Sequence, residues 1–233
     1  MRKLVLMGTA AALVAFAGVA QARDQVTGNV DLTSDYLFRG ITQTNHKPAI
    51  QGGLDYSSKI GVYAGLWGSN VNFGPADGTS QELDTYAGYS ASAGPIGYDV
   101  GVIYYNYPGG INTDNFYEVY GKVSWQGLTL GNAWSHDYFG GTGTSNYLSA
   151  DYDIPANLPA GLSISLHAGH QWIADNAAWG TPDYTDYGLS VSKDFAGLTW
   201  KLAYSDTNLS KSECFGGSNL CEGTGVLSVG KNF

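Results

Sequence analysis

The sequence predicts an all-β protein: an antiparallel up-and-down transmembrane β-barrel of about 12 strands, preceded by an N-terminal signal peptide. Three observations predict it. The chain opens with an apolar export signal, and about a dozen short segments then alternate apolar and polar residues, as strands with two different faces do. The chain ends on Phe233, with Leu227 and Val229 behind it at even spacing.

Residues 1–22 have the form of a cleaved signal peptide. Met1-Arg2-Lys3 is a short basic head, the stretch to Ala20 is apolar, and Ala20-Gln21-Ala22 has the small-x-small form of a cleavage site. The alternative is a retained membrane anchor, which the short apolar stretch disfavours. We therefore expect residues 23–233 to form the barrel, in the bacterial outer membrane.

Composition supports a membrane wall over a water-soluble surface. Only 13% of the residues are charged, against about 25% in soluble domains. The 33 Gly and 17 Tyr suit tilted strands and interfacial aromatic bands. Without Arg2 and Lys3, 9 basic residues stand against 20 acidic ones, a net charge of −11. Nucleic acid is therefore excluded as a partner, because phosphate contacts need a basic face.

The alternation of apolar and polar residues with a period of two predicts the strands in sequence order. The connections after even strands are short and those after odd strands are longer and polar, which is the layout of an outer-membrane barrel with short periplasmic turns. An even strand number also brings both ends of the barrel to the short-turn side. The predicted strands are 25–39, 48–57, 59–70, 81–91, 97–107, 115–125, 127–138, 145–154, 161–172, 184–194, 197–206 and 223–233.

The aromatic residues on the predicted outer face fall into two levels, as interfacial girdles do. The alternative, a soluble β-sandwich with these rings inside, would need more surface charge. The long-loop level comprises Tyr36, Phe38, Tyr104, Tyr117, Trp134, Tyr138, Trp172, Tyr187 and Tyr204. The short-turn level comprises Tyr56, Tyr89, Tyr98, Trp125, Tyr152, Trp200 and Phe233.

The predicted inner face is rich in carboxylates. An excess of carboxylates in a lumen favours the passage of cations. The alternative is that these charges satisfy one another inside a filled barrel. The predicted pore-lining residues are Asp31, Asp35, Arg39, Glu82, Asp84, Asp99, Glu118, Lys122 and Lys201, with further inward carboxylates at Asp151, Asp153 and Asp186.

Inward aromatic residues have two interpretations. Rings in a lumen can line a track for a sugar or nucleoside, or they can fill space between small glycines, which is the commoner use. The residues concerned are Tyr63, Trp67, Tyr86, Tyr105 and Tyr120.

Cys214 and Cys221 lie in a polar Gly/Ser-rich segment, where an oxidising periplasm favours a disulfide over a metal site. We expect no metal, no cofactor and no enzymatic activity. Ser135, His136 and Asp137 are consecutive, so on a strand the histidine points away from both neighbours. His167 and His170 likewise face opposite sides.

Several stretches resemble the TorF family of putative porins, over nearly the whole chain after the signal. They include LTSDYLFRGITQ from Leu32, KPAIQGGLDY from Lys47, YAGLWGSNV from Tyr63, ELDTYAGY from Glu82, YDVGVIYY from Tyr98 and DYTDY from Asp183. The resemblance implies an outer-membrane channel of proteobacterial type. Arg39 and Gly40 lie in the first of these stretches, which suggests a constriction or a loop anchor. The simpler interpretation is a strand-end salt bridge between Arg39 and Asp35.

The functional expectation is a passive diffusion channel for small polar solutes or ions, weakly cation-preferring. The alternative is a structural or adhesin-like barrel with a plugged lumen and functional loops. Expected partners are outer-membrane lipid, the permeating solutes or ions, and the barrel-insertion machinery, which would recognise Leu227, Val229 and Phe233 in the C-terminal strand. The sequence leaves the oligomeric state and the solute open.

Overall fold

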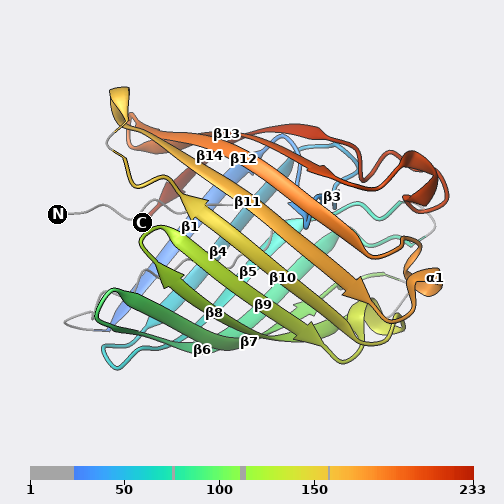
Figure 1. Ribbon diagram of the computed structural model, residues 1–233, viewed down its shortest axis with the longest axis horizontal. Helices are drawn as coiled ribbons and strands as arrows, with labels where there is room; N and C mark the ends of the chain where they lie inside the picture. Colours follow the sequence, from blue (N-terminus) through green and yellow to red (C-terminus); the bar gives the residue numbers. More distant parts are fainter. Residues whose placement is uncertain (1–23, 75–76, 111–113, 157) are drawn as a thin grey trace.

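The computed structural model describes residues 24–74, 77–110, 114–156 and 158–233. Within them, twelve strands close into one antiparallel barrel (Figure 1). These strands are β1 (Gln25–Thr33), β4 (Ala49–Ser57), β5 (Val62–Asn70), β6 (Gln81–Ala93), β7 (Ile96–Asn106), β8 (Phe116–Trp125), β9 (Leu128–Ser135), β10 (Ser145–Asp153), β11 (Leu162–Ile173), β12 (Tyr184–Phe195), β13 (Leu198–Thr207) and β14 (Thr224–Asn232).

The barrel closes where β1 meets β14. Neighbours in sequence pair all the way round the barrel, and β1 pairs with β4 on one side and with β14 on the other. Beyond the last ladder pair, the amide of Phe233 donates to the carbonyl of Gly28 at 2.9 Å, and the amide of Gly28 donates back at 2.8 Å. The last residue of the chain therefore takes part in the closure.

Short turns lie at one end of the barrel and long loops at the other (Figure 1). Short helical pieces occur in the connections: η1 (Tyr138–Gly140), η2 (Pro159–Gly161), α1 (Asn176–Trp179) and η3 (Lys211–Glu213). In the described part of the chain, no helix has the length and apolarity needed to cross a membrane.

The outer face of the barrel is apolar and carries the expected aromatic rings. Leu202, for example, is 62% exposed and Val100 is 55% exposed. The outward positions are confirmed for Tyr104, Tyr117, Trp134, Trp172, Tyr187 and Tyr204 at the long-loop level and for Tyr56, Tyr89, Tyr98, Trp125, Tyr152, Trp200 and Phe233 at the short-turn level. Three outward assignments are wrong, because Tyr36, Phe38 and Tyr138 are buried.

The strand prediction is confirmed for eleven strands to within three residues and is wrong at the end of the first. The prediction continues that strand to Arg39, whereas β1 ends at Thr33. The chain then turns into the barrel, and we call residues 34–48 the inserted segment. The predicted signal peptide, residues 1–22, lies outside the described residues.

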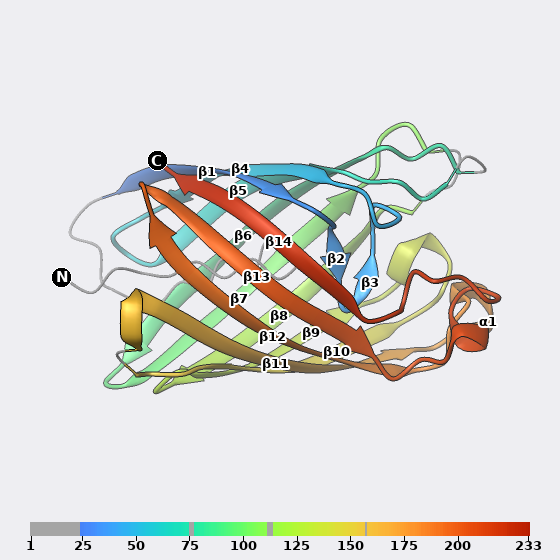
Figure 2. The same cartoon turned by 90° about the horizontal axis from the view of Figure 1, so that it is seen from above.

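A small hairpin forms the deepest part of the inserted segment (Figure 2). β2 (Leu37–Phe38) and β3 (Ile41–Thr42) pair across a two-residue turn. Both turn residues have positive φ, 49° at Arg39 and 79° at Gly40, as a two-residue hairpin of type I′ requires. A Cβ at Gly40 would also clash with Asp186 and Thr207, so glycine is needed there on two counts. The turn presents the Arg39 side chain to the barrel interior.

The apolar outer face gives a first prediction. Val100 lies on β7 between the exposed rings of Tyr98 and Tyr104, near the middle of the apolar band. A Val100→Arg substitution should lower the free energy of unfolding by about 2–4 kcal/mol, because a cation is costly at the bilayer midplane. The measurement is chemical unfolding in lipid vesicles.

Val26→Arg is the matched control. Val26 is also exposed, at 74%, but lies at the short-turn end of β1. A cation near the interface should cost only about 0–1 kcal/mol. Equal losses for the two variants would contradict a lipid-facing band centred on Val100.

Candidate functional site

The candidate site is the barrel interior, because the charged side chains of the strands gather there. Strand alternation directs seven of the predicted pore-lining residues inward from the wall: Asp31, Glu82, Asp84, Asp99, Glu118, Lys122 and Lys201. The other two, Asp35 and Arg39, also lie inside the barrel, but on the inserted segment. The wall residues and the inserted segment therefore meet in one interior.

Arg39 fastens the inserted segment to the opposite wall. Its Nη2 donates to both carboxylate oxygens of Glu118, at 2.8 and 2.7 Å, and its Nη1 donates to Oε1 of Gln171 at 2.6 Å. The guanidinium also lies 4.2 Å from the centre of the Tyr147 ring. Burial alone would lower the pKa of Arg39, but the Glu118 carboxylate and nearby tyrosines raise it above its ordinary value. Arg39 is therefore a buried, fully charged anchor.

Asp35 organises the inserted segment itself. Its carboxylate accepts from the hydroxyls of Thr42 at 2.5 Å and Thr44 at 2.8 Å, and lies 2.9 Å from Nδ1 of His46. The interpretation of an Asp35–Arg39 salt bridge is wrong, because each residue has other partners. Asp35 holds the segment in shape, and Arg39 holds it in place.

Aromatic rings pack the inserted segment into the long-loop half of the barrel. Tyr36 meets Trp67 edge to face at 5.4 Å, and Phe38 meets Tyr105 at 5.8 Å. Burial, and then the charges of Glu82 and Asp84, hold the pKa of Tyr36 well above its ordinary value. The inward rings therefore fill space here, in agreement with the simpler interpretation of the pattern.

The last long loop covers the inserted segment. Cys214 and Cys221 form the expected disulfide, both fully buried. The amide of Thr42 donates to the carbonyl of Leu220 at 3.0 Å, and Nε2 of His46 lies 3.0 Å from the carbonyl of Asn219. The disulfide-closed loop thus continues the packed interior to the long-loop surface.

Tyrosines in the wall lie flat over glycines of the next strand. A Cβ on Gly65 would overlap the Tyr86 ring, and one on Gly88 would overlap Tyr63. The position of each ring determines which carboxylate its hydroxyl can reach. Tyr86 donates to Asp55 at 2.5 Å, and Tyr63 donates to Asp99 at 2.5 Å. The glycines therefore give the tyrosines room to hold carboxylates at fixed places on the wall.

The short-turn half of the interior is charged and only partly accessible, because Asp55, Asp99 and Lys201 are buried there whereas Asp153 is exposed. We call its charged set the acidic vestibule. Asp31 and Lys122 are partly exposed, and the Asp151 side chain is 37% exposed. By contrast, Glu82, Asp84 and Glu118 in the long-loop half are only 1–2% exposed. The vestibule comprises Asp31, Asp55, Asp99, Asp151 and Asp153 with Lys122 and Lys201.

His167 joins the two halves, and it is a site residue that was not predicted from the sequence. Its Nδ1 lies 2.7 Å from Asp151, and its Nε2 lies 2.7 Å from Asp186. The Tyr147 hydroxyl donates to Asp186 at 2.9 Å. Gln171, the second partner of Arg39, was also missed. Strand alternation places both residues inward, but their partners lie on other strands and are not readable locally.

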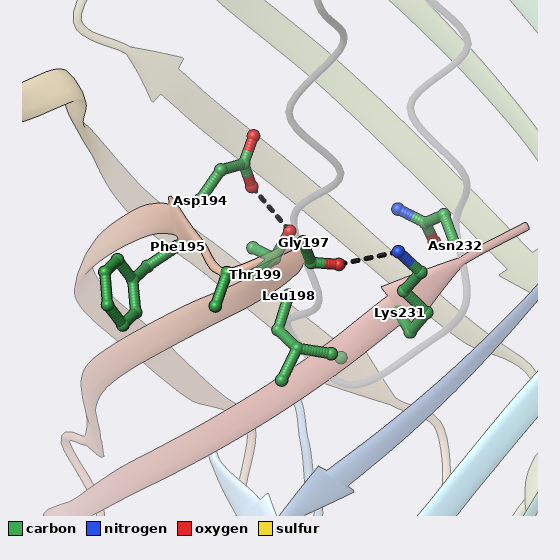
Figure 3. A pocket seen from close by; sticks show the side chains of 9 residues that line it. Asp194, Phe195, Gly197, Leu198, Thr199, Lys231 and Asn232 are labelled. Carbon is green, nitrogen blue, oxygen red and sulfur yellow. Dashed lines mark hydrogen bonds between the residues drawn. The ribbon is translucent and has the colours of Figure 1, made fainter.

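A shallow recess lies outside this interior, at the short-turn rim (Figure 3). It is formed by the β12–β13 turn and the end of β14. Nζ of Lys231 donates to the carbonyl of Gly197 at 2.8 Å, and the Thr199 hydroxyl donates to Asp194 at 2.7 Å. The Lys231 contact ties the turn to the last strand, and the Thr199 contact joins the two strands that flank the turn.

The chain belongs to a family of bacterial proteins described as "Bacterial protein of unknown function (Gcw_chp)", whose model matches residues 17–233. The match does not carry the TorF name, which stays a resemblance. No curated protein sequence matches this chain at a significant level.

Solved porin structures share the fold. The structure titled "KdgM porin in complex with disordered oligogalacturonate" matches with a TM-score of 0.54 at 9% identity, over 89% of this chain and 97% of that one. The NanC porin matches with a TM-score of 0.53 at 11% identity, over 88% and 98%. At such identities the likeness concerns the fold, which is that of a porin barrel.

The tyrosine–glycine contacts give a second prediction. Gly65→Ala should push the Tyr86 ring away, since the three nearest atoms to a Cβ there all belong to Tyr86, and should lower the free energy of unfolding by about 1–3 kcal/mol, as overpacking does. Gly121→Ala is the control, because a Cβ there meets its nearest neighbour at 3.9 Å. Chemical unfolding in vesicles measures both. Equal effects would contradict the role given to the contact.

The Arg39 anchor gives a third prediction. Arg39→Ala leaves Glu118 buried and unpaired, and should lower the free energy of unfolding by about 3–5 kcal/mol. Removing Glu118 as well should recover much of that loss, since the unpaired charge is then gone. A double-mutant cycle measured by chemical unfolding gives the coupling.

Lys211→Ala provides the control for the cycle. Lys211 lies 3.6 Å from Glu222 in an exposed ion pair, with side chains 66% and 54% exposed. Its loss should cost no more than about 1 kcal/mol. Additive losses for Arg39→Ala and Glu118→Ala would refute the anchor.

Proposed function

We propose that this member of the Gcw_chp family is an outer-membrane channel for small polar solutes or ions. The observation that carries the proposal is the closed barrel with an apolar outer face and a charged interior. An apolar wall suits hydrocarbon, and a charged interior suits hydrated solutes. The fold shared with porins supports the same conclusion. The role needs no catalytic residue.

The charge of the vestibule supports a preference for cations. Five carboxylates stand there against the two ammonium groups of Lys122 and Lys201, and one of the five, Asp151, is also paired with His167 at 2.7 Å. A lumen with excess carboxylates attracts cations and repels anions. The oligogalacturonate in the KdgM porin complex is a polyanion. For this chain we propose neutral or cationic solutes instead.

The inserted segment makes the channel narrow. Arg39, Glu118 and Gln171 are each buried, so the anchor blocks the middle of the long-loop half. Twelve strands also enclose less room than the sixteen to eighteen of open porins. Low conductance follows. Each passing solute must be small or must displace part of the segment.

The inserted segment also favours a second candidate, a structural barrel with a filled interior. In that case the long loops would carry the function. The disulfide-closed loop over the inserted segment is a rigid surface suited to such a role. The two candidates differ in one measurable property, conductance.

The fourth prediction is the single-channel behaviour of residues 23–233 refolded into a planar bilayer under a KCl gradient. We expect small discrete current steps and a reversal potential biased toward K⁺. Asp99→Asn and Asp151→Asn should each reduce the bias, because each removes one negative charge from the vestibule. Asp194→Asn, on the exposed β12–β13 turn, is the matched control.

The Arg39→Ala Glu118→Ala double variant should conduct more than the wild type, since the inserted segment has lost its anchor. Silence from a protein shown to be folded would reject the channel in favour of the structural barrel. Current steps with an unchanged reversal potential in the vestibule variants would reject the cation preference alone.

A further inference from the structure

The long connections of the barrel each send an aromatic ring to one cluster at the long-loop end. Within the described residues, these connections are the inserted segment and the loops that follow β5, β7, β9, β11 and β13. We call their rings the aromatic hub. The hub comprises Phe38, Phe73, Tyr107, Phe139, Trp179 and Phe215. The helix that carries Trp179, α1, lies at this end of the barrel (Figure 1).

Phe139 lies at the centre of the hub. Its ring centre is 4.8 Å from that of Trp179 and 5.5 Å from that of Tyr107. The ring centres of Phe38 and Phe73 are each 6.4 Å away. Rings at such separations attract each other in edge-to-face or offset arrangements. One side chain therefore connects the loop after β9 to the inserted segment and to the loops after β5, β7 and β11.

The disulfide-closed loop joins the hub through α1. The ring centre of Phe215 lies 5.4 Å from that of Trp179. The amide of Phe215 also donates to the carbonyl of Gly180, the residue after α1, at 3.0 Å. The loop after β13 is therefore held to the loop after β11 by a ring contact and by a backbone hydrogen bond.

The inserted segment is joined to its neighbours by its backbone as well. The amide of Asn72, after β5, donates to the carbonyl of Gln43 at 2.7 Å. The amide of Thr42 donates to the carbonyl of Leu220 in the disulfide-closed loop at 3.0 Å. Together with the amide of Phe215, these amides mark the joints between different connections, and each joint breaks when its two connections separate.

The backbone of Phe139 is strained. Its φ of 44° and ψ of 40° lie in the left-handed region, where a bulky side chain is rarely found because its Cβ is crowded. The local turn therefore does not favour phenylalanine at this position, and the ring contacts must hold it there. Phe215 is in the same situation, with a φ of 43°. Glycine fits either backbone without strain, so a change to glycine removes the ring alone.

The hub spans the depth of the long-loop mouth. Phe38 and Tyr107 are buried in the packed interior, whereas Phe73, Phe139 and Trp179 are partly exposed and pack against it. The rings thus extend from the inserted segment to the surface, at the end of the barrel through which a solute would enter.

We propose that the aromatic hub joins the long connections into a single lid over the long-loop mouth, and that this lid is the gate of the channel. The gating role rests on the proposed function. A lid held by many ring contacts opens as one unit, because moving Phe139 breaks several contacts at once. The hub then sets how often the channel opens, whereas the Arg39–Glu118 anchor sets how much current an open channel carries.

The fifth prediction concerns hydrogen exchange of residues 23–233 refolded in lipid vesicles, resolved to single amides by mass spectrometry of overlapping peptides. In the wild type, the amides of Thr42, Asn72 and Phe215 should share one protection factor to within about threefold, because they become exposed in the same opening. Phe139→Gly should lower all three protection factors by about tenfold or more, since several ring contacts are lost together.

Phe215→Gly is the matched control. The substitution is the same and the φ of the backbone is similar, but among the described rings Phe215 contacts Trp179 alone. It should release the joint at residue 215 and leave the Asn72 amide protected as in the wild type. Heat-shifted mobility in gel electrophoresis checks that both variants keep the barrel. If Phe139→Gly fails to fold, the wild-type comparison of the three amides decides.

Single-channel recording tests the gating role. Phe139→Gly should raise the fraction of time that the channel is open by about tenfold and leave the height of the current steps unchanged. The Arg39→Ala Glu118→Ala double variant should raise the step height instead. Silence of the wild type and of Phe139→Gly, with the protection factors lowered as expected, would reject the channel and support the lid.

Three results would overturn the proposal. One is a wild type in which the protection factors of the three amides differ by more than about tenfold, because the connections would then open separately. Another is a Phe139→Gly variant that loses protection no more widely than Phe215→Gly does. The last, in a protein that conducts, is an open fraction that Phe139→Gly leaves at the wild-type value.

Discussion

Hydrocarbon offers no hydrogen-bond partner to a peptide group, so a strand that faces lipid must be paired on both sides. The pairing of β1 with β14 meets this constraint for the whole sheet, since it removes both edges. The exchange of two hydrogen bonds between Gly28 and Phe233 extends the closure to the last residue. Everything inside the barrel, including the inserted segment and its charges, depends on this closed wall.

Closure of twelve strands leaves an interior space, and the inserted segment fills part of it. Eight strands leave a space that their own side chains fill, whereas twelve leave more. Here the tyrosines that pack over glycines lie flat against the wall, so their side chains do not extend across the interior space. The chain fills the long-loop half with residues 34–48, and the polar backbone of that segment needs partners in turn. The hairpin supplies some of them, and Asp35, with Thr42 and Thr44, supplies others. Arg39 then connects this small folded unit to the wall through Glu118.

Period two predicted the strands and their faces well, because a strand between lipid and a polar interior alternates strictly. The alternation predicted the wrong face where an apolar side chain packs inside the barrel instead of facing lipid. Tyr36 and Phe38 continue the alternation of β1, yet they pack on Trp67 and Tyr105 inside the barrel. Tyr138 fails for the same reason. The Arg39–Glu118 pair joins residues 79 apart in sequence, and no local pattern specifies such a partner. Gly40 was the available signal, since glycine favours the second position of a two-residue type I′ hairpin, but Arg39 is not among the residues preferred at the first position.

The interior charges fall into two groups: some keep access to water, and others are buried and depend on a fixed partner. This difference bears on function. In the acidic vestibule, carboxylates such as Asp151 keep access to water and face Lys122 and Lys201, so they can meet a passing ion without a large change in solvation. In the long-loop half, water is excluded, and a carboxylate needs a fixed partner: Glu118 has Arg39, whereas Asp84 has no hydrogen bond to its buried Oδ1 among the described residues. In the proposed channel, an ion that enters from the short-turn end meets the more hydrated region first, and one that enters from the long-loop end meets the dry region first. Passage through the dry region of the proposed channel requires movement of the inserted segment, which Arg39 fastens to Glu118.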